Sequence, residues 1–332
     1  MNTRGKLWIA ALLAALAIGA AGCGGSDTAS KNQKDKVYNV GILQLVEHPA
    51  LDAANKGFVD GLAAKGFAGG KNVKFDRQNA QGDQSNLQTI AQRFVANKDD
   101  LVCAIATPAA QTMANATKTI PIVGTAITDY KAAKLVQDPS KPGTNVTGTT
   151  DMNPVEAQID LLVQIMPKAK TLGFIYSSSE VNSQIQVDLA KKAAAARGLK
   201  TVEATVSNVN DIQQAAQSLV GKVDAIYVPT DNVLASAMAN LVKITDEAKI
   251  PVFCGEGGMT KAGGVATLGI DYYKLGYQTG EMAAAILKGE SKPENMAIQS
   301  QQTFTVLIND AQVKKLGLTI PDAIKKEAEG AK

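Results

Sequence analysis

The stretch LVCAIATPAAQTMANATKTIPIVGTAI (101–127) carries the pattern that decides the fold. The apolar run at 101–107 predicts a buried strand, and the apolar run at 121–127 predicts the next one. Between them, the residues from Pro108 onward predict a helix. Two apolar strands separated by a helix are typical of parallel strands joined by a crossover.

The same alternation continues on both sides of this unit. Before it, we expect strands at 37–45 and 72–80 and helices at 51–65 and 86–96. A Pro- and Gly-rich loop at 138–148 follows it, and the rhythm then begins again. The pattern predicts an α/β fold with two doubly wound, Rossmann-like lobes, and a cleft between two lobes suits a small ligand. In the second series we expect strands at 171–176, 199–206, 224–229 and 250–255, and helices at 154–166, 181–197, 211–220, 232–248 and 272–287.

The N-terminal residues predict export. Arg4 and Lys6 precede an uncharged run, from Leu7 to Ala20, that is too short to cross a membrane and fits a secretory signal peptide. Small residues then lead to Cys23, and the string AAGC resembles the lipobox of bacterial lipoproteins, in which the cysteine receives lipid.

We therefore expect a signal peptide at 1–22, a lipid on Cys23 and a flexible polar tether at 23–36. The alternative is ordinary cleavage that leaves Cys23 as a free thiol. The lipid would anchor the exported protein to the outer face of the cell membrane, and without it the protein would be periplasmic.

Composition argues against several classes of function. Loss of Arg4 and Lys6 with the signal peptide lowers the formal net charge from +3 to +1, so nothing favours nucleic acid as a partner. One histidine and no closely spaced cysteine pair lead us to expect no metal site and no cofactor. Cys103 and Cys254 lie in apolar runs and are expected to be buried thiols, with a disulfide between them left open.

Polar residues follow the predicted strands, where ligands bind in open α/β sheets. Helix starts at these points favour an anion, and carboxylates such as Asp231 would hold an ammonium group, so the pattern suits an amino acid. For each residue the alternative is that it only caps a helix. The predicted ligand-binding residues at strand ends are Gln44, Glu47, His48, Thr107, Ala109, Thr128, Asp129, Ser178, Ser179, Thr230, Asp231, Asn232 and Glu256.

Seven strings across 37–325 together resemble the ABC-transporter substrate-binding proteins related to tryptophan- and tyrosine-binding lipoproteins. The resemblance implies a type I periplasmic-binding fold, a clamp of two lobes joined by three crossovers. It implies a first lobe of 37–149 plus 272–300 and a second lobe of 150–271 plus 301–325. The strings are VEHPALDA (46–53), TPAAQT (107–112), NVTGTTD (145–151), YSSSEVNS (176–183), VPTDN (228–232), GIDYYKLGYQTGEMAAAIL (269–287) and NDAQVKKLGLTIP (309–321).

The resemblance also implies cleft residues. Asp271, before the last helix of the second series, completes the predicted ligand-binding set. Tyr130 stands where the family commonly has Pro, and we expect it to add an aromatic wall to the pocket. Tyr272, Tyr273 and Tyr277 are expected to pack within the fold. Carried over on matching positions are Glu47, His48, Thr107, Ser178, Asn182, Asp231 and Asn232.

The function we expect is capture without chemistry. The protein would bind an aromatic amino acid as a monomer and deliver it to an ABC permease. A module that reports solute to a membrane receptor is the alternative. An extracellular enzyme is disfavoured, because one histidine and no G-x-S-x-G string leave no nucleophile with its base and no catalytic residues to name.

Overall fold

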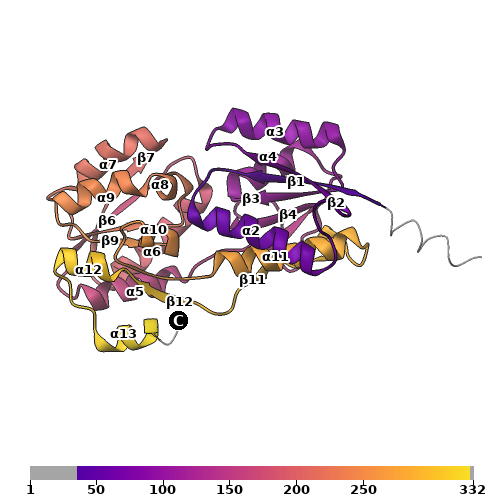
Figure 1. Ribbon diagram of the computed structural model, residues 1–332. Coiled ribbons are helices and arrows are strands. Elements are labelled where there is room, and N and C mark those ends of the chain that lie inside the picture. The colour runs from indigo at the N-terminus through magenta and orange to yellow at the C-terminus, as the bar shows by residue number, and fades with distance from the viewer. Residues whose placement is uncertain (1–35, 330–332) are drawn as a thin grey trace, which may run out of the picture. The chain divides into compact units, whose positions relative to one another are not determined.

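The computed structural model describes residues 36–329 and divides the chain into two units, Met1–Lys36 and Val37–Lys332. The predicted signal peptide, Cys23 and all of the predicted tether except Lys36 lie outside the described residues. The account below concerns the second unit, in which two sets of strands define a first and a second lobe (Figure 1).

The first lobe is built on a six-stranded sheet with the order β11-β5-β4-β3-β1-β2, and all its strand pairs are parallel. Helices α2 and α11 lie on one side of this sheet, and α3 and α4 lie on the other (Figure 1). The elements are β1 (Tyr38–Gln44), α2 (Pro49–Ala64), β2 (Val73–Asn79), α3 (Gln84–Asn97), β3 (Leu101–Ile105), α4 (Thr107–Ala116), β4 (Ile122–Ile127), β5 (Val146–Thr150), α11 (Tyr272–Leu287), η2 (Pro293–Asn295) and β11 (Gln299–Ser300).

The second lobe holds a four-stranded parallel sheet with the order β7-β6-β8-β9 and a separate antiparallel pair, β10-β12. Two apolar clusters, one with α5 and α6 and one with α7 and α9, pack against the strands. The elements are α5 (Val155–Ile165), β6 (Thr171–Ser177), α6 (Val181–Ala196), β7 (Lys200–Val206), η1 (Val209–Asp211), α7 (Ile212–Leu219), β8 (Ala225–Val228), α8 (Asn232–Ser236), α9 (Met238–Glu247), β9 (Val252–Cys254), α10 (Gly257–Lys261), β10 (Ala266–Gly269), β12 (Thr305–Ile308), α12 (Asp310–Leu316) and α13 (Asp322–Glu329).

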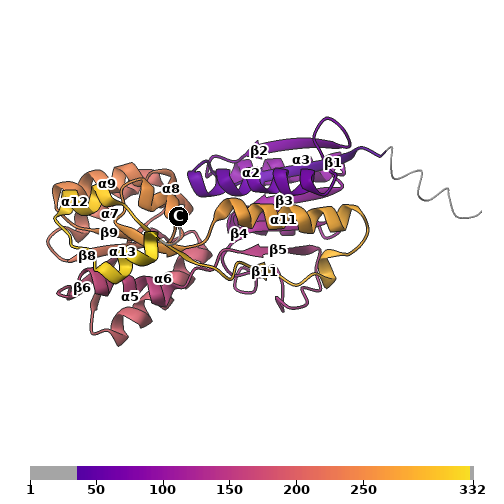
Figure 2. The same ribbon diagram turned by 60° about the horizontal axis from the view of Figure 1, so that its bottom comes forward.

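The chain passes between the lobes at three connections, β5 to α5, β10 to α11 and β11 to β12. Figure 2 shows α11 continuing from one of them, with β11 beside β5. The predicted α/β class with parallel sheets is confirmed.

Two details differ from the sequence-based expectation. The predicted helix at 232–248 is two helices, α8 and α9, which are interrupted at Ala237. The Ser236 hydroxyl donates to the Val233 carbonyl, a local bond that competes with the helical pattern. Cys103 and Cys254 are both buried and free, so the open possibility of a disulfide between them is not realised.

Four glycines bring α2 and α11 into unusually close contact. A Cβ atom built on Gly276 would lie 1.9 Å from the Ala54 carbonyl oxygen, and one on Gly57 would lie 2.0 Å from the carbonyl oxygen of Tyr273. Gly61 and Gly280 meet the facing backbone in the same way, at 2.2 and 2.3 Å. Backbone packs directly on backbone along this glycine seam, so no larger residue fits.

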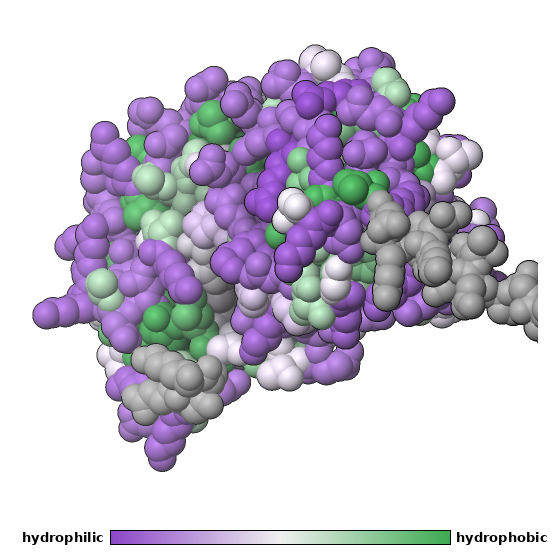
Figure 3. Space-filling model, turned by 45° about the vertical axis from the view of Figure 1, so that its right-hand side comes forward, coloured by the Kyte–Doolittle hydropathy of each residue, from purple (hydrophilic) through white to green (hydrophobic). Residues whose placement is uncertain are grey.

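The surface of the described residues is mostly polar. On the face in Figure 3, hydrophobic residues form small groups among hydrophilic ones. Among residues 36–329, no helix combines the length and apolar character that a membrane span needs. The large hydrophobic side chains that are exposed are Val37, Leu189, Val209, Val220 and Phe304.

The glycine seam predicts the effect of one methyl group on stability. Gly276→Ala gains about 1 kcal/mol of helix propensity. The clash with the Ala54 carbonyl costs more, since overpacking typically costs about 1–3 kcal/mol and here the obstacle is backbone. We expect a net fall in the free energy of unfolding, measured by urea denaturation. Gly257→Ala is the control, because its new Cβ would meet only a side chain at 3.5 Å. If Gly276→Ala and Gly257→Ala have the same free energy of unfolding, the close backbone contact at the glycine seam does not limit residue size as described.

Candidate functional site

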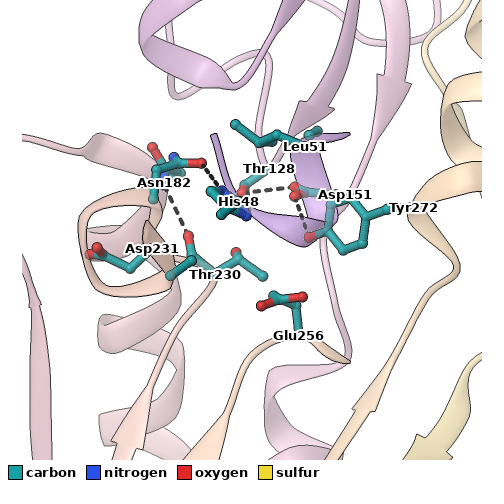
Figure 4. Close-up of a pocket in the computed structure, with 12 residues that line it drawn as sticks. His48, Leu51, Thr128, Asp151, Asn182, Thr230, Asp231, Glu256 and Tyr272 are labelled. Atoms are coloured by element: carbon teal, nitrogen blue, oxygen red, sulfur yellow. Dashed lines mark hydrogen bonds between the residues drawn. The ribbon is translucent and has the colours of Figure 1, made fainter. Parts of the chain in front are cut away.

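Twelve residues from both lobes line a pocket at the carboxyl ends of the strands (Figure 4). The first lobe contributes the start of α2 and the ends of β4 and β5, and the second contributes the segments after β8 and β9. Tyr272, the first residue of α11, lies beside one of the connections between the lobes. This inner pocket is lined by His48, Leu51, Ala126, Thr128, Asp151, Asn182, Thr230, Asp231, Asn232, Ala235, Glu256 and Tyr272.

Two hydrogen bonds join the lobes directly beside the inner pocket. His48 Nε2 lies 3.2 Å from Asn232 Oδ1, and Gln186 Nε2 donates to Thr128 Oγ1 over 3.4 Å. His48 occupies the N-cap position of α2, where an extended backbone and Pro49 begin the helix, and its ring is buried. Its other ring nitrogen, Nδ1, is buried without a partner.

Asp151 holds one wall of the inner pocket together. Its carboxylate accepts hydrogen bonds from Thr128 Oγ1 at 2.9 Å and from the Tyr272 hydroxyl at 2.8 Å. Figure 4 shows these three side chains converging. Burial raises the pKa of Asp151, and the two hydrogen bonds oppose that shift.

Asp231 and Glu256 cap the short helices that follow β8 and β9. Glu256 accepts from the backbone N–H groups of Gly258 and Met259, and burial raises its pKa. The Asp231 carboxylate accepts from the N–H groups of Leu234 and Ser177 and from a serine hydroxyl. In Figure 4 it points away from Glu256.

Glu180 extends this group of buried carboxylates behind the pocket wall. Burial, and then the charge of Asp231, raise its pKa to about 8. No lysine or arginine lines the inner pocket. Since buried carboxylates are costly without a positive partner, the arrangement favours a ligand that brings a positive charge.

Backbone strain marks the ends of the two central strands. Ala106, after β3, has φ 85°, and Ala126, the last but one residue of β4, has φ 55°. Non-glycine residues in this region cost about 1–3 kcal/mol and cluster at binding sites. Thr107 follows Ala106 as the first residue of α4, and its buried hydroxyl has no partner. An unpaired buried hydroxyl at a helix start is suited to an anionic group.

A second cavity, here called the outer groove, lies next to the inner pocket and shares Asn232 with it. Both lobes form its walls. The residues that line it are Leu45, Val46, Gln81, Gly82, Gln84, Leu87 and Pro108 from the first lobe, and Ser179, Glu180, Ser207, Asn208, Val209, Asn232, Val233 and Ser236 from the second.

The structure brings about half of the predicted ligand-binding residues into the inner pocket. Ser179 lines the outer groove instead. The predicted residues that line the inner pocket are His48, Thr128, Asn182, Thr230, Asp231, Asn232 and Glu256. Those that line neither cavity are Gln44, Glu47, Thr107, Ala109, Asp129, Ser178 and Asp271.

Local contacts explain several of these positions. Gln44 donates to Val46 O and Asp52 inside the first lobe. Asp129 and Asp271 accept from backbone N–H groups a few residues onward, as helix or turn caps do. Glu47 and Ser178 are exposed, whereas Thr107 and Ala109 are buried at the start of α4.

The expectation for Tyr130 was wrong. Tyr130 adds no wall to the inner pocket, because its hydroxyl donates to the carbonyls of Gly124 and Thr149 inside the first lobe. Tyr272 is buried in the hydrophobic core of the first lobe, as expected, and it also lines the inner pocket. Asp151 was missed because β5 was not recognised as a strand, although its string NVTGTTD stood out. Leu51, Ala126 and Ala235 carried no signal that separates a pocket wall from core.

Among residues 36–329, no group of three or more His, Cys, Asp and Glu side chains could hold a metal ion. The arrangement therefore offers hydrogen bonds, buried negative charge and apolar walls, which are the means of binding a small organic molecule.

Comparison with known proteins gives the same direction. Residues 39–332 match the model of the family described as ABC transporter substrate binding protein. The chain is 44% identical to a tyrosine-binding protein of Clostridioides difficile over 297 residues, which are 89% of this chain and 86% of that protein.

Two solved structures of relatives differ in their likeness to this one. A Streptococcus pneumoniae ABC domain in complex with L-Trp is 42% identical, with a TM-score of 0.86 over 88% of this chain and 99% of that one. The ligand-free, open structure of a Clostridium difficile substrate-binding protein is 48% identical, yet its TM-score is 0.66 over 86% and 97%. Because the more identical relative fits less well, sequence divergence does not explain the difference.

His48 predicts a pH dependence of stability. Burial is the main cause that lowers its pKa, against smaller opposite effects of the Asn232 bond and the Asp52 charge. The folded protein thus binds fewer protons at this group than the unfolded chain does. Above about pH 6.5 His48 therefore does not lower the free energy of unfolding. As the pH falls below that value, the unfolded chain takes up the proton more readily, and the folded protein loses stability.

The test compares the free energy of unfolding of the wild type and His48→Gln between pH 5 and 7.5. Asp99, whose pKa is raised to about 6, titrates in both proteins, so the difference isolates the only histidine. We expect the wild type to lose stability relative to the variant as the pH falls. A difference that stays constant with pH would contradict this expectation.

Proposed function

This chain belongs to the family of ABC transporter substrate-binding proteins, and we propose that it captures an aromatic amino acid and presents it to the permease of an importer. The family consists of solute-binding proteins and not of enzymes, which agrees with the expectation of no catalytic residues. The observation that carries the ligand class is the group of buried carboxylates, without a basic side chain, in a pocket that both lobes line.

The ligand's ammonium group is assigned to Asp151 and Glu256. Both carboxylates are buried, both line the inner pocket, and their present partners leave acceptor capacity on each. Asp231, the first candidate from the sequence, accepts three hydrogen bonds from its own lobe and serves as a cap in this proposal.

The ligand's carboxylate is assigned to the start of α4. Thr107 supplies a buried hydroxyl without a partner, and the first N–H groups of a ten-residue helix favour negative charge. The predicted residues Thr107 and Ala109 would thus bind ligand although neither lines the inner pocket.

An aromatic side chain is supported by two lines of reasoning. The relatives named above include a tyrosine-binding protein and a complex with L-Trp. In this chain, the outer groove beside the inner pocket has apolar side chains from both lobes among its polar ones. Aromatic ligands gain from such mixed walls because they combine a large apolar area with a polar end.

Capture requires the lobes to move. The inner pocket has a remaining volume of about 10 Å³, enough for about one water molecule. The greater likeness to the L-Trp complex supports a closed arrangement here, so a ligand would enter when the lobes separate. A ligand that contacts both lobes favours closure, since it binds that form more tightly.

The same proposal places the protein outside the cytoplasm as a monomer, anchored by lipid on Cys23 and followed by the polar tether. Its partners are then the amino acid and the membrane permease, with no role for nucleic acid. Anchoring keeps the binding protein close to the permease and so raises its effective concentration there.

Calorimetric titration with amino acids tests the ligand class. We expect heat with Trp, Tyr or Phe and none with the des-amino analogue 3-(indol-3-yl)propanoate, because the buried carboxylates would then lack their positive partner. Absence of heat with all three aromatic amino acids would refute the proposed class of ligand.

Glu256→Gln tests whether Glu256, and not Asp231, binds the ammonium group of the ligand. The amide keeps one of the two oxygens that accept from the Gly258 and Met259 N–H groups, so the α10 cap is weakened but retained, and the affinity for ligand is expected to fall by about 2–5 kcal/mol. Asp231→Asn is the matched comparison and is expected to lower thermal stability more than affinity. Affinity is measured by titration and thermal stability by melting. If Asp231→Asn lowers the affinity more than Glu256→Gln does, the ammonium group is assigned to Asp231 instead.

Cys23→Ser tests the anchor. The wild type is expected in the membrane fraction with a labelled lipid, and the variant in the soluble exported fraction, because the residue that receives the lipid is gone. Soluble wild-type protein without label would show ordinary cleavage, and membrane association that persists in the variant would show another anchor.

A further inference from the structure

We infer that the outer groove receives the aromatic side chain of the ligand, while the inner pocket and the start of α4 hold its charged groups. This inference rests on the proposed function and adds the place where selectivity for the side chain arises. The groove has a cavity volume of about 450 Å³, against about 10 Å³ for the inner pocket. Of these two neighbouring cavities, only the groove has room for a ring system.

The walls of the outer groove suit an uncharged, apolar group. Leu45, Val46 and Leu87 face it from the first lobe, and Val209 and Val233 face it from the second. An indole or phenol ring placed between two such walls buries both of its faces, which is the geometry in which aromatic groups gain most from leaving water.

The only ionisable residue of the groove lining is Glu180. Its carboxylate is buried and accepts hydrogen bonds from Asn182, Asn232 and the Val233 N–H. No lysine or arginine lines the groove to hold a ligand carboxylate, and the donors of Asn182, Asn232 and Val233 already occupy the Glu180 carboxyl group. The ligand's charged groups have no partner here, so its uncharged part is the part that fits.

The groove adjoins both the inner pocket and the start of α4. Pro108 lines it and directly follows Thr107, the residue assigned to the ligand's carboxylate. Asn232 lines both cavities and lies across the boundary between them, bonded to His48. A ligand anchored between these points has its ammonium toward Asp151 and Glu256 and its side chain toward the groove.

The groove also couples side-chain size to closure. Its two walls belong to different lobes, so they face each other only when the lobes are together. A large side chain contacts both walls and favours the closed form, whereas a small one leaves that contribution out. Selectivity for large apolar side chains follows without any hydrogen bond to the ring.

Two exposed valines of the second lobe provide a matched test. Val209 lines the groove and Val220 lines neither cavity, yet each is 41% exposed. In Val209→Asn a polar amide faces the bound ring without a full set of partners, and we expect about 5- to 10-fold weaker binding of L-Trp. Val220→Asn is expected to bind within about 2-fold of the wild type.

The ligand itself can report its surroundings. The only tryptophan of the sequence is Trp8, within the predicted signal peptide, so protein that begins at Cys23 contains no indole. Fluorescence of bound L-Trp then comes from the ligand alone. We expect its emission to shift to shorter wavelength on binding, with a smaller shift in Val209→Asn than in Val220→Asn.

A second variant probes the opposite wall. Val46→Thr replaces a methyl group that faces the ring with a hydroxyl. Val46 is only partly buried, so we expect folding to be preserved and the binding of L-Trp to weaken. If the wild type binds L-Trp but Val209→Asn and Val46→Thr match Val220→Asn in affinity and emission, the groove assignment is wrong and the proposed function stands. If the wild type binds no aromatic amino acid, the proposed function and the groove assignment are both wrong.

Discussion

Buried negative charge without a positive side chain is the constraint on which the site depends. Asp151, Asp231 and Glu256 line one pocket, and all three side chains are largely removed from water. Each is supported by N–H or O–H donors, which stabilise a carboxylate but do not neutralise it. Taking such groups out of water is costly, and a cation between them recovers much of that cost. The inner pocket therefore has the acidic groups of an ion pair without the basic ones.

The buried carboxylates come from both lobes. Asp151 belongs to the connection that leaves the first lobe, Glu256 follows a strand of the second, and the His48–Asn232 bond closes the space between them. A ligand that satisfies the carboxylates must therefore contact both lobes, and the same contact holds them together. Ligand binding and lobe closure are therefore coupled, because the ammonium group of the ligand pairs with carboxylates of both lobes.

Sequence reasoning predicted the fold more fully than the site. The strands at 101–107 and 121–127 correspond to β3 and β4, because long apolar runs with a helix between them admit few other structures. Residues at recognised strand ends, such as Thr128 and Glu256, were found by the same logic. Asp151 was not, since β5 is short and rich in threonine and glycine. Tyr130 was wrongly expected at the pocket, and the pocket contact of Tyr272 was missed beside its packing role, because periodicity cannot tell which buried ring also reaches a cavity.

The glycine seam between α2 and α11 has a further consequence for how such a protein can diversify. One helix begins beside His48 and the other begins with Tyr272, so the seam fixes the spacing of two pocket walls through main-chain contact alone. Neither helix can slide or rotate to admit a new solute without breaking that contact. Descendants of this chain can therefore acquire new specificities by exchanging side chains at the helix starts and strand ends, while the scaffold that presents them is inherited unchanged.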